Sequence, residues 1–321
     1  TVTDTYGSSD VMVAEVKYLP VTNTSNDPDA YYATITDAID AAETLDGDVI
    51  TVCAGTYTES IYVWKDITLL GPNTGKDPNI ETRVPEAIIH PSEWYNVYLD
   101  VTGVTIDGFT FDGLGTCDYG IYAYTTSGAG NLLLTNNIVK NYSTYGFIGY
   151  TNTGPVSSNN LLTRNLFTSI PGRAIVPLWN YYANVTDNVI TETPIGIYAE
   201  NAYLPEATGL VEWKNNEITA TRSGIWYNLA YGTATSLTIK DNIIDVDDNP
   251  SGTRWDGIWL TSLGGSINPV ISGNIITGSA VTQQTNGYNL WNNTTTVTDG
   301  ITIMGGSVTN VDYGIWINNW D

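Results

Sequence analysis

The chain has few histidine and cysteine residues, from which many metal and catalytic centres are built. Its 321 residues include one histidine, His90, and two cysteines, Cys53 and Cys117. The cysteines lack the close paired spacing of a zinc site, which argues against that class of metal centre. They would allow a single disulfide, but burial of both side chains inside the fold is the favoured interpretation.

Long apolar runs and basic residues are scarce as well. No stretch approaches the ~20 apolar residues that a membrane-spanning helix needs, and no charged, apolar signal segment follows Thr1. Thirty-four acidic residues against eleven basic ones give a formal charge of -23. Such a charge repels polyanions, so nucleic acid and anionic lipid are not expected partners.

The sequence is rich instead in residues that suit strands and tight turns. Charged residues make up only 14% of the chain, while threonine, asparagine, glycine, tyrosine and tryptophan are abundant, which favours strands over helices. An acidic chain of this kind with several Asn-x-Ser/Thr sequons predicts an extracellular or cell-surface location. The sequons begin at Asn23, Asn141, Asn184, Asn292 and Asn293.

A repeat of about thirty residues runs from about Val101 to Trp316. One half of each repeat is an asparagine beside apolar residues, at Asn137, Asn165, Asn188, Asn216, Asn242 and Asn274. The other half is a small residue followed by an apolar one, beginning at Gly120, Gly146, Ala174, Gly196, Gly224, Gly257 and Gly314. A fixed period of this length marks a solenoid, in which no unit can bury its apolar face without its neighbours.

Strand alternation assigns each position of the repeat to one side of the chain. If the Gly-Ile-Trp segments are strands, the middle residue points inward and the aromatic residue points outward. The inward residues are then Ile121, Phe147, Ile175, Ile197, Ile225, Ile258 and Ile315. The recurring asparagine lies at a turn, where its amide can bond the backbone and stack on the next asparagine. We interpret this asparagine column as structural.

The first hundred residues divide into an arm, a helix and the first strands. Residues 1–30 form the arm, whose apolar stretch Val11–Val16 could be a strand. A helix is expected at about residues 34–43, where it would cover the open end of a solenoid. The apolar residues that share one face of that helix are Ile35, Ala38, Ile39 and Ala42. One β-helix domain is predicted over residues 31–321, with regular coils over about 101–316.

The segment from Tyr32 to Gly71 resembles the opening of pectin-lyase-like right-handed parallel β-helix proteins. Its motifs are Tyr32-Ala-Thr-Ile-Thr-Asp-Ala-Ile, Gly47-Asp-Val-Ile-Thr-Val, Ala54-Gly-Thr-Tyr-Thr-Glu and Ile67-Thr-Leu-Leu-Gly. The later coils are similar to carbohydrate-associated repeats of the same superfamily, so the resemblance covers roughly residues 31–316. It implies an all-β fold, a single-stranded right-handed parallel β-helix solenoid with an N-terminal helical cap.

The alternation also places five aromatic residues outward in one file along the solenoid. These residues are Tyr122, Tyr198, Trp226, Trp259 and Trp316. Exposed aromatic strips mark interaction surfaces, and flat rings suit stacking against pyranose rings, so these five are the candidate carbohydrate-binding residues. Two alternatives stay open: the file mediates self-association, or its rings only pack on one another. Arg173 would point outward at a gap in the file, either covering it or binding a carboxylate or sugar hydroxyl.

None of the active-site patterns of polysaccharide-active members of the superfamily is present. Gln283 and Gln284 are adjacent, whereas the methylesterase pattern needs two separated glutamines. His90 stands in Ile-His-Pro rather than in the Gly-His-Gly of polygalacturonases, and Arg83-Val-Pro lacks the second arginine of pectate lyases. These mismatches favour a protein that is not an enzyme.

An acidic loop supplies the candidate metal ligands. Asp245, Asp247, Asn249 and Asp256 place oxygen side chains at the spacing of a looped calcium site, so Ca²⁺ is the cofactor that this loop would take. A solvated acidic loop is the alternative. The same loop would serve polysaccharide cleavage if two of its carboxylates stood at the separation used by glycosidases.

These observations predict an extracellular or cell-surface β-helix that binds polysaccharide or another glycan along its aromatic file, without catalysis. One alternative is a polysaccharide lyase or glycoside hydrolase that uses the acidic loop. The other is a structural subunit that assembles with further copies through the solenoid ends or the N-terminal arm.

Overall fold

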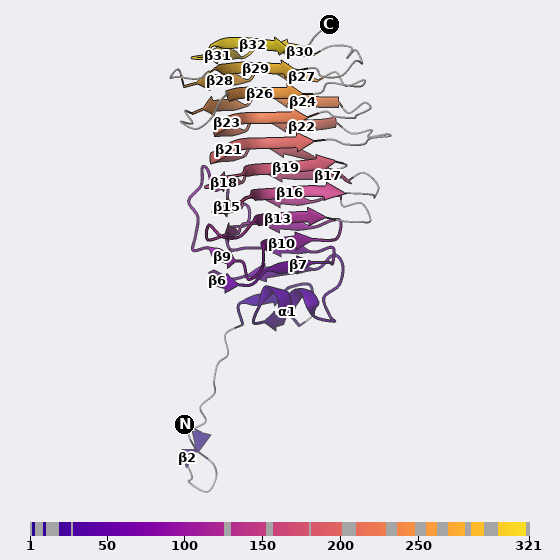
Figure 1. Cartoon of the computed structure of the whole chain (residues 1–321). Coiled ribbons are helices and arrows are strands. Elements are labelled where there is room, and N and C mark those ends of the chain that lie inside the picture. The colour runs from indigo at the N-terminus through magenta and orange to yellow at the C-terminus, as the bar shows by residue number, and fades with distance from the viewer. Residues whose placement is uncertain are drawn as a thin grey trace.

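The computed structural model describes residues 2–3, 9–10, 19–26, 28–124, 130–151, 157–179, 181–200, 210–228, 236–247, 255–261, 269–279, 284–291 and 301–318. Within these residues the chain forms a stack of parallel strands, which rises from the N-terminal end at the bottom of Figure 1 to the C-terminal end at the top. Almost all of the regular structure is strand, and the described residues contain one α-helix.

Three ladders of parallel strands enclose the core, and we number them as faces 1 to 3. Face 1 contains β5 (Val49–Val52), β8 (Thr68–Leu70), β11 (Thr105–Asp107), β14 (Leu133–Thr135), β17 (Ser157–Thr163), β20 (Tyr181–Thr186), β22 (Leu210–Lys214), β24 (Ser236–Lys240), β27 (Val270–Ser272) and β30 (Thr302–Met304). Face 2 contains β6 (Gly55–Thr58), β9 (Ala87–His90), β12 (Thr110–Asp112), β15 (Ile138–Lys140), β18 (Leu166–Thr168), β25 (Ile243–Val246), β28 (Ile275–Gly278) and β31 (Ser307–Thr309).

Face 3 carries most of the aromatic side chains discussed below. It contains β7 (Ile61–Val63), β10 (Tyr95–Leu99), β13 (Tyr119–Tyr124), β16 (Tyr145–Thr151), β19 (Arg173–Trp179), β26 (Trp255–Thr261), β29 (Thr285–Trp291) and β32 (Tyr313–Asn318). Two long strands, β21 (Val189–Glu200) and β23 (Glu217–Asn228), cross from face 2 to face 3 without a break.

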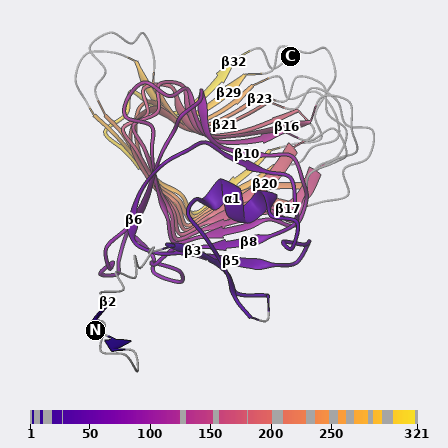
Figure 2. The ribbon, with the colours of Figure 1, turned by 90° about the horizontal axis from the view of Figure 1, so that it is seen from below.

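The coil is right-handed. Seen from the N-terminal end in Figure 2, the chain runs clockwise from β5 at the bottom past β6 on the left toward the ladder of β10 at the top. Later coils lie farther from the viewer, and a clockwise path that recedes is a right-handed one, as expected for parallel crossovers. The parallel register between successive coils confirms the β-helix that the repeat predicts.

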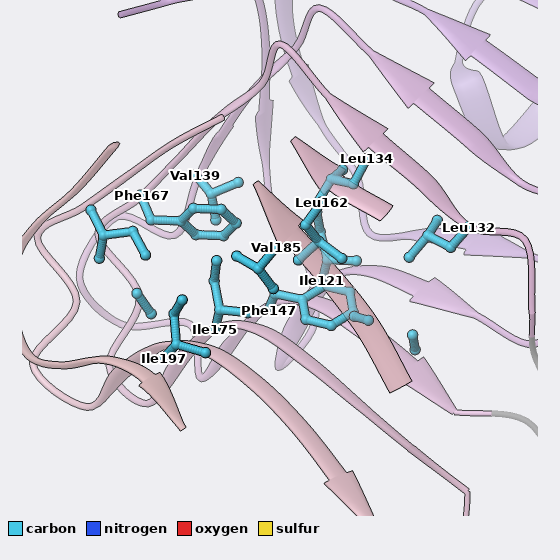
Figure 3. Close-up of a cluster of buried hydrophobic side chains, with 14 of the residues drawn as sticks. Ile121, Leu132, Leu134, Val139, Phe147, Leu162, Phe167, Ile175, Val185 and Ile197 are labelled. Carbon is cyan, nitrogen blue, oxygen red and sulfur yellow. The ribbon is translucent and has the colours of Figure 1, made fainter. Parts of the chain in front are cut away.

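The interior is one continuous apolar core. Figure 3 shows Phe147 and Ile175 of face 3 among Leu134, Leu162 and Val185 of face 1. The predicted inward column is confirmed, since its members up to β26 are fully buried: Ile121, Phe147, Ile175, Ile197, Ile225 and Ile258. Ile315, on the last strand of the stack, is 50% exposed because no described coil lies over it.

The asparagine column is a buried hydrogen-bonded stack. Asn165 is typical: its backbone N–H and its Nδ2 both donate to Oδ1 of Asn188, each at 3.0 Å. Its Nδ2 also donates to the carbonyl oxygens of Leu134 and Thr163. The same pattern recurs from Asn137 to Asn242, so the amides satisfy backbone groups that the turn would otherwise bury unpaired. The structural interpretation of the column is confirmed.

A left-handed residue precedes each asparagine of the column. The residues and their φ angles are Asn136 54°, Arg164 54°, Asp187 58°, Asn215 56°, Asp241 54° and Gly273 67°. This conformation is costly for most residues but tolerated by asparagine, aspartate and glycine, which hold most of these positions. The sharp corner between faces 1 and 2 follows from it, and the asparagine is directed inward.

The N-terminal end contains the helix α1 (Ile35–Asp40), which is shorter than the predicted span of 34–43. Its Ile35, Ala38 and Ile39 are buried, and Figure 2 shows it between faces 1 and 3. The Glu59 carboxylate accepts from the first backbone N–H groups of the helix, and the Lys65 ammonium donates to its last carbonyl oxygens. That α1 serves as a cap over the core stays a prediction.

One expectation for the N-terminal region changes. The antiparallel strands β3 (Val21–Asn23) and β4 (Ala30–Tyr32) join the edge of face 1, so the end of the predicted arm packs on the solenoid. The parallel coils begin at β5, which confirms the first strands expected before Gly71, and β8 continues in parallel register to β11. β1 (Val2–Thr3) and β2 (Ser9–Asp10) pair with each other, and the expected strand Val11–Val16 lies outside the described residues.

The two cysteines are both free thiols. Cys117 is buried, and burial raises the pKa of its thiol to about 11. Cys53 is exposed, contrary to expectation, because it follows the inward-pointing Val52 and therefore points outward. None of the described helical residues forms a segment long and apolar enough to span a membrane.

Candidate carbohydrate-binding face

The outward side chains of face 3 fall into rows because the register is continuous from coil to coil. The central row comprises Tyr62, Tyr98, Tyr122, Ile148, Val176, Tyr198, Trp226, Trp259, Asn289 and Trp316. The structure brings all five predicted aromatic residues into this row. Sequence reasoning missed Tyr62 and Tyr98, which lie in coils before the recognised repeat.

The central row is less exposed than expected. Tyr198 is only 7% exposed, and Tyr122, Trp226, Trp259 and Trp316 are half-buried. The cause is a second apolar cluster on the outside of face 3, which the interior pattern does not reveal. Its buried members are Ile148, Val176, Ile195 and Tyr198, with Tyr119, Tyr122, Tyr145, Tyr150, Leu178 and Trp226 packed against them.

The indoles of Trp226 and Trp259 lie face to face. Their ring centroids are 4.2 Å apart with an angle of 12° between the planes, and Tyr198 meets Trp226 edge-on at 4.9 Å. A sugar ring cannot enter a gap of 4.2 Å, and rings stacked along the solenoid axis present their edges outward. The stacked faces of these two rings stabilise the solenoid, and a binding role of Trp226 and Trp259 stays a prediction.

We predict that Trp226 and Trp259 stabilise the fold as a coupled pair. Urea unfolding of Trp226→Ala, Trp259→Ala and the double variant measures how much each change lowers the free energy of unfolding. The two single decreases should add up to about 1 kcal/mol more than the decrease in the double variant, because each single change already removes the stacking contact. Strictly additive losses would contradict direct stacking in solution.

Trp94 is the exposed aromatic residue best placed for stacking on a ligand. It directly precedes β10, and its side chain is 44% exposed. Four tyrosine rings lie beneath its indole, each nearly perpendicular to it. They are Tyr95 at 4.9 Å and 81°, Tyr122 at 5.1 Å and 83°, Tyr119 at 5.4 Å and 84°, and Tyr98 at 6.5 Å and 88°.

The contacts of the Trp94 indole with these rings are all of the edge-to-face kind. The rings of Tyr95 and Tyr98 are inclined by 65° to each other, and those of Tyr119 and Tyr122 by 50°, yet all four are nearly perpendicular to the indole. The indole is thus held by four phenol rings while 44% of the side chain stays exposed.

The backbone around Trp94 is anchored on both sides. The Ser60 hydroxyl oxygen accepts from the N–H groups of Ser92 and Glu93, and its proton goes to the carbonyl oxygen of Tyr95. The Trp94 carbonyl oxygen accepts from the Tyr119 N–H at 3.2 Å. The indole is thus preorganised by the solenoid, which lowers the entropy cost of binding on it.

The tyrosines of this face carry hydroxyl groups, and the Asp100 carboxylate lies near Tyr62 and Tyr98. Burial, reinforced by the Asp100 charge, raises the pKa of Tyr98 to about 12, and burial and the bond to Tyr150 raise the pKa of Tyr122 further. The Tyr62 hydroxyl donates to Asp100 at 2.9 Å. At neutral pH the phenols keep their protons, so this patch offers neutral donors beside one acceptor carboxylate.

The predicted calcium loop is only partly within the described residues. Asp245 and Asp247 are exposed at the end of β25, and Asn249 lies outside the described residues. Asp256 is buried at the start of β26, where it accepts from the Asn286 amide at 2.7 Å. Partial desolvation, and then the Asp247 charge, raise the pKa of Asp245. Among the described residues no three acidic, histidine or cysteine side chains gather to hold a metal, and the calcium site stays a prediction.

No family model and no curated protein matches the chain. The solved structures that are similar to it include two A-modules of mannuronan C-5 epimerases from Azotobacter vinelandii. The AlgE4 module has 13% identity and a TM-score of 0.46 over 87% of this chain and 91% of that one. The AlgE6 module has 14% identity and a TM-score of 0.41 over 88% and 92%. Similarity at this level carries no inference about activity.

Proposed function

We propose that this protein is an extracellular or cell-surface β-helix that binds polysaccharide on face 3 without cleaving it. The observation that carries the proposal is the Trp94 indole, which is 44% exposed and is held in edge-to-face contact by four tyrosine rings. An indole face held in this way matches the apolar C–H face of a pyranose ring.

The surroundings of Trp94 fit a sugar better than a purely apolar ligand. Stacking on a sugar leaves hydroxyl groups at the rim of the ring, and the neighbouring phenols, with the Asp100 carboxylate farther along the face at Tyr62, offer hydrogen bonds to a longer ligand. The aromatic side chains continue from Tyr62 to Tyr122 at the strand spacing of about 4.8 Å. A surface extended along the solenoid suits a polymer rather than a single sugar.

Trp94→Ala tests the proposal by retention on insoluble cellulose, chitin and xylan. We expect the wild-type protein to be retained on at least one of them and Trp94→Ala to bind about thirty-fold more weakly, because an anchoring tryptophan contributes about 2 kcal/mol. Trp64→Ala is the matched control. Trp64 is similarly exposed, at 46%, but its indole donates to Asp40 and contacts no tyrosine ring among the described residues.

The outcomes of this assay separate the alternatives. Equal retention of Trp94→Ala and the wild-type protein would show that the Trp94 indole does not take part in binding. New reducing ends or unsaturated products in the bound fraction would move the function to polysaccharide cleavage. Concentration-dependent fibres without retention on any polymer would favour the assembling subunit.

A further inference from the structure

Arg173 occupies an unusual position on face 3. It lies in the row beside the central row, in register with Tyr119 and Tyr145 on one side and Ile195 on the other. Its guanidinium carbon is 4.3 Å from the ring centroid of Tyr198 and 5.7 Å from that of Tyr145. Two aromatic rings thus hold the planar cation in place.

The cation has no acidic partner among the described residues. The four ion pairs found there all involve other basic residues, although the chain carries thirty-four acidic ones. Glu200 accepts from the Tyr198 hydroxyl at 2.7 Å instead. Of the five N–H groups of Arg173, one donates to the Tyr145 hydroxyl at 3.0 Å, and Nε is buried without an acceptor.

Such an arrangement is costly without a ligand. Partial burial of a guanidinium removes water from its donors, and contact with aromatic rings restores only part of the lost hydration. An oxyanion is the group that a fixed, planar guanidinium recognises best, through charge-assisted hydrogen bonds. The formal charge of -23 repels anions over most of the surface, so an anionic polymer is expected to bind only where a cation such as Arg173 offsets that repulsion.

We propose that Arg173 binds an anionic oxygen group, a carboxylate or a sulfate, of the polysaccharide bound on face 3. This inference rests on the proposed function and adds its charge specificity. Arg173 on β19 lies three strands beyond β10, next to which Trp94 stands, and three strand spacings amount to about 14 Å. A polymer lying along the solenoid reaches both residues, whereas one sugar does not.

The test compares neutral and charged forms of the same polymer by titration calorimetry. The probes are cellulose, chitin and xylan derivatives in soluble neutral, carboxymethylated and sulfated forms. We expect wild-type protein to bind a charged form about ten-fold more tightly than its neutral parent, and Arg173→Gln to bind both equally. The tighter of the carboxymethylated and sulfated forms identifies the anion. Added sodium chloride should reduce the preference.

The variants separate a binding role from a structural one. Arg173→Lys keeps the charge and should retain part of the preference, while Arg173→Gln should leave affinity for the neutral polymer unchanged if its fold, checked by circular dichroism, is intact. Arg164→Gln removes the same charge from an exposed turn and should behave as wild type. A preference that survives in Arg173→Gln, or equal binding of neutral and charged forms by wild type, would overturn the assignment and leave the proposed function standing. Failure of every polymer to bind would overturn both.

Discussion

Replacing Asn188 by alanine is expected to lower the free energy of unfolding by about 4 kcal/mol. The Asn188 side chain accepts from the backbone N–H and Nδ2 of Asn165, and it donates to the carbonyl oxygens of Leu162 and Thr186. All of these groups are buried, and each one left unpaired costs about 1–3 kcal/mol. Urea unfolding followed by circular dichroism measures the loss.

Asn215→Gly provides the matched control. The Asn215 side chain makes one exposed hydrogen bond, to Asp187, and its φ of 56° suits glycine. Asn215→Gly should lower the free energy of unfolding by less than about 1 kcal/mol. If Asn188→Ala destabilised the protein no more than this control, the asparagine column would not hold the coils together.

Alkaline pH is expected to unfold the protein steeply above pH 10. Burial raises the pKa of the Tyr142, Tyr181 and Tyr227 phenols well above the ordinary value of about 10. Below pH 10 both states are protonated and stability is unaffected. Above pH 10 the unfolded chain releases these three protons, and those of the raised phenols Tyr98, Tyr122 and Tyr198, while the folded chain retains them. Stability therefore falls as pH rises, and the three buried phenols alone contribute about 4 kcal/mol per pH unit.

Thermal melts between pH 8 and pH 12, together with absorbance of the phenolate, test this prediction. The exposed phenols should titrate first without loss of structure, and the remainder should ionise together with the unfolding transition. Tyr227→Phe should make the decline in stability less steep. Ionisation of every tyrosine near pH 10 with the fold intact would contradict the burial of these three side chains.

Much of the fold could be predicted because each repeat carries two independent signals, an inward apolar residue and a corner asparagine. The inward isoleucines from Ile121 to Ile258 fix which side of each strand faces the core, and the asparagines fix where each corner falls. What the repeat could not show is how the first strands join the later coils. The first strands, expected before Gly71, lack the asparagine at their corners and are followed by a long excursion near residues 73–94, so the repeat alone does not give their register with the later coils.

The sequence predicts which aromatic residues of the candidate site align in one row, but it does not predict how exposed their side chains are. Strand alternation and a constant period suffice to place Tyr122, Tyr198 and Trp226 in one row. Exposure depends on neighbouring rows as well, and Arg173 and Trp226 cover Tyr198 from adjacent coils. Trp94 could not be found from the repeat, because it lies in the excursion before β10 and its position depends on the loop that Ser60 anchors.

The most direct test is a crystal structure with an oligosaccharide prepared from the polysaccharide that retains the protein. The account predicts a pyranose ring stacked on the outer face of the Trp94 indole, with the oligosaccharide extending along face 3 toward β19. An oligosaccharide bound on face 1 or face 2, or bound with the Trp94 indole free, would contradict it.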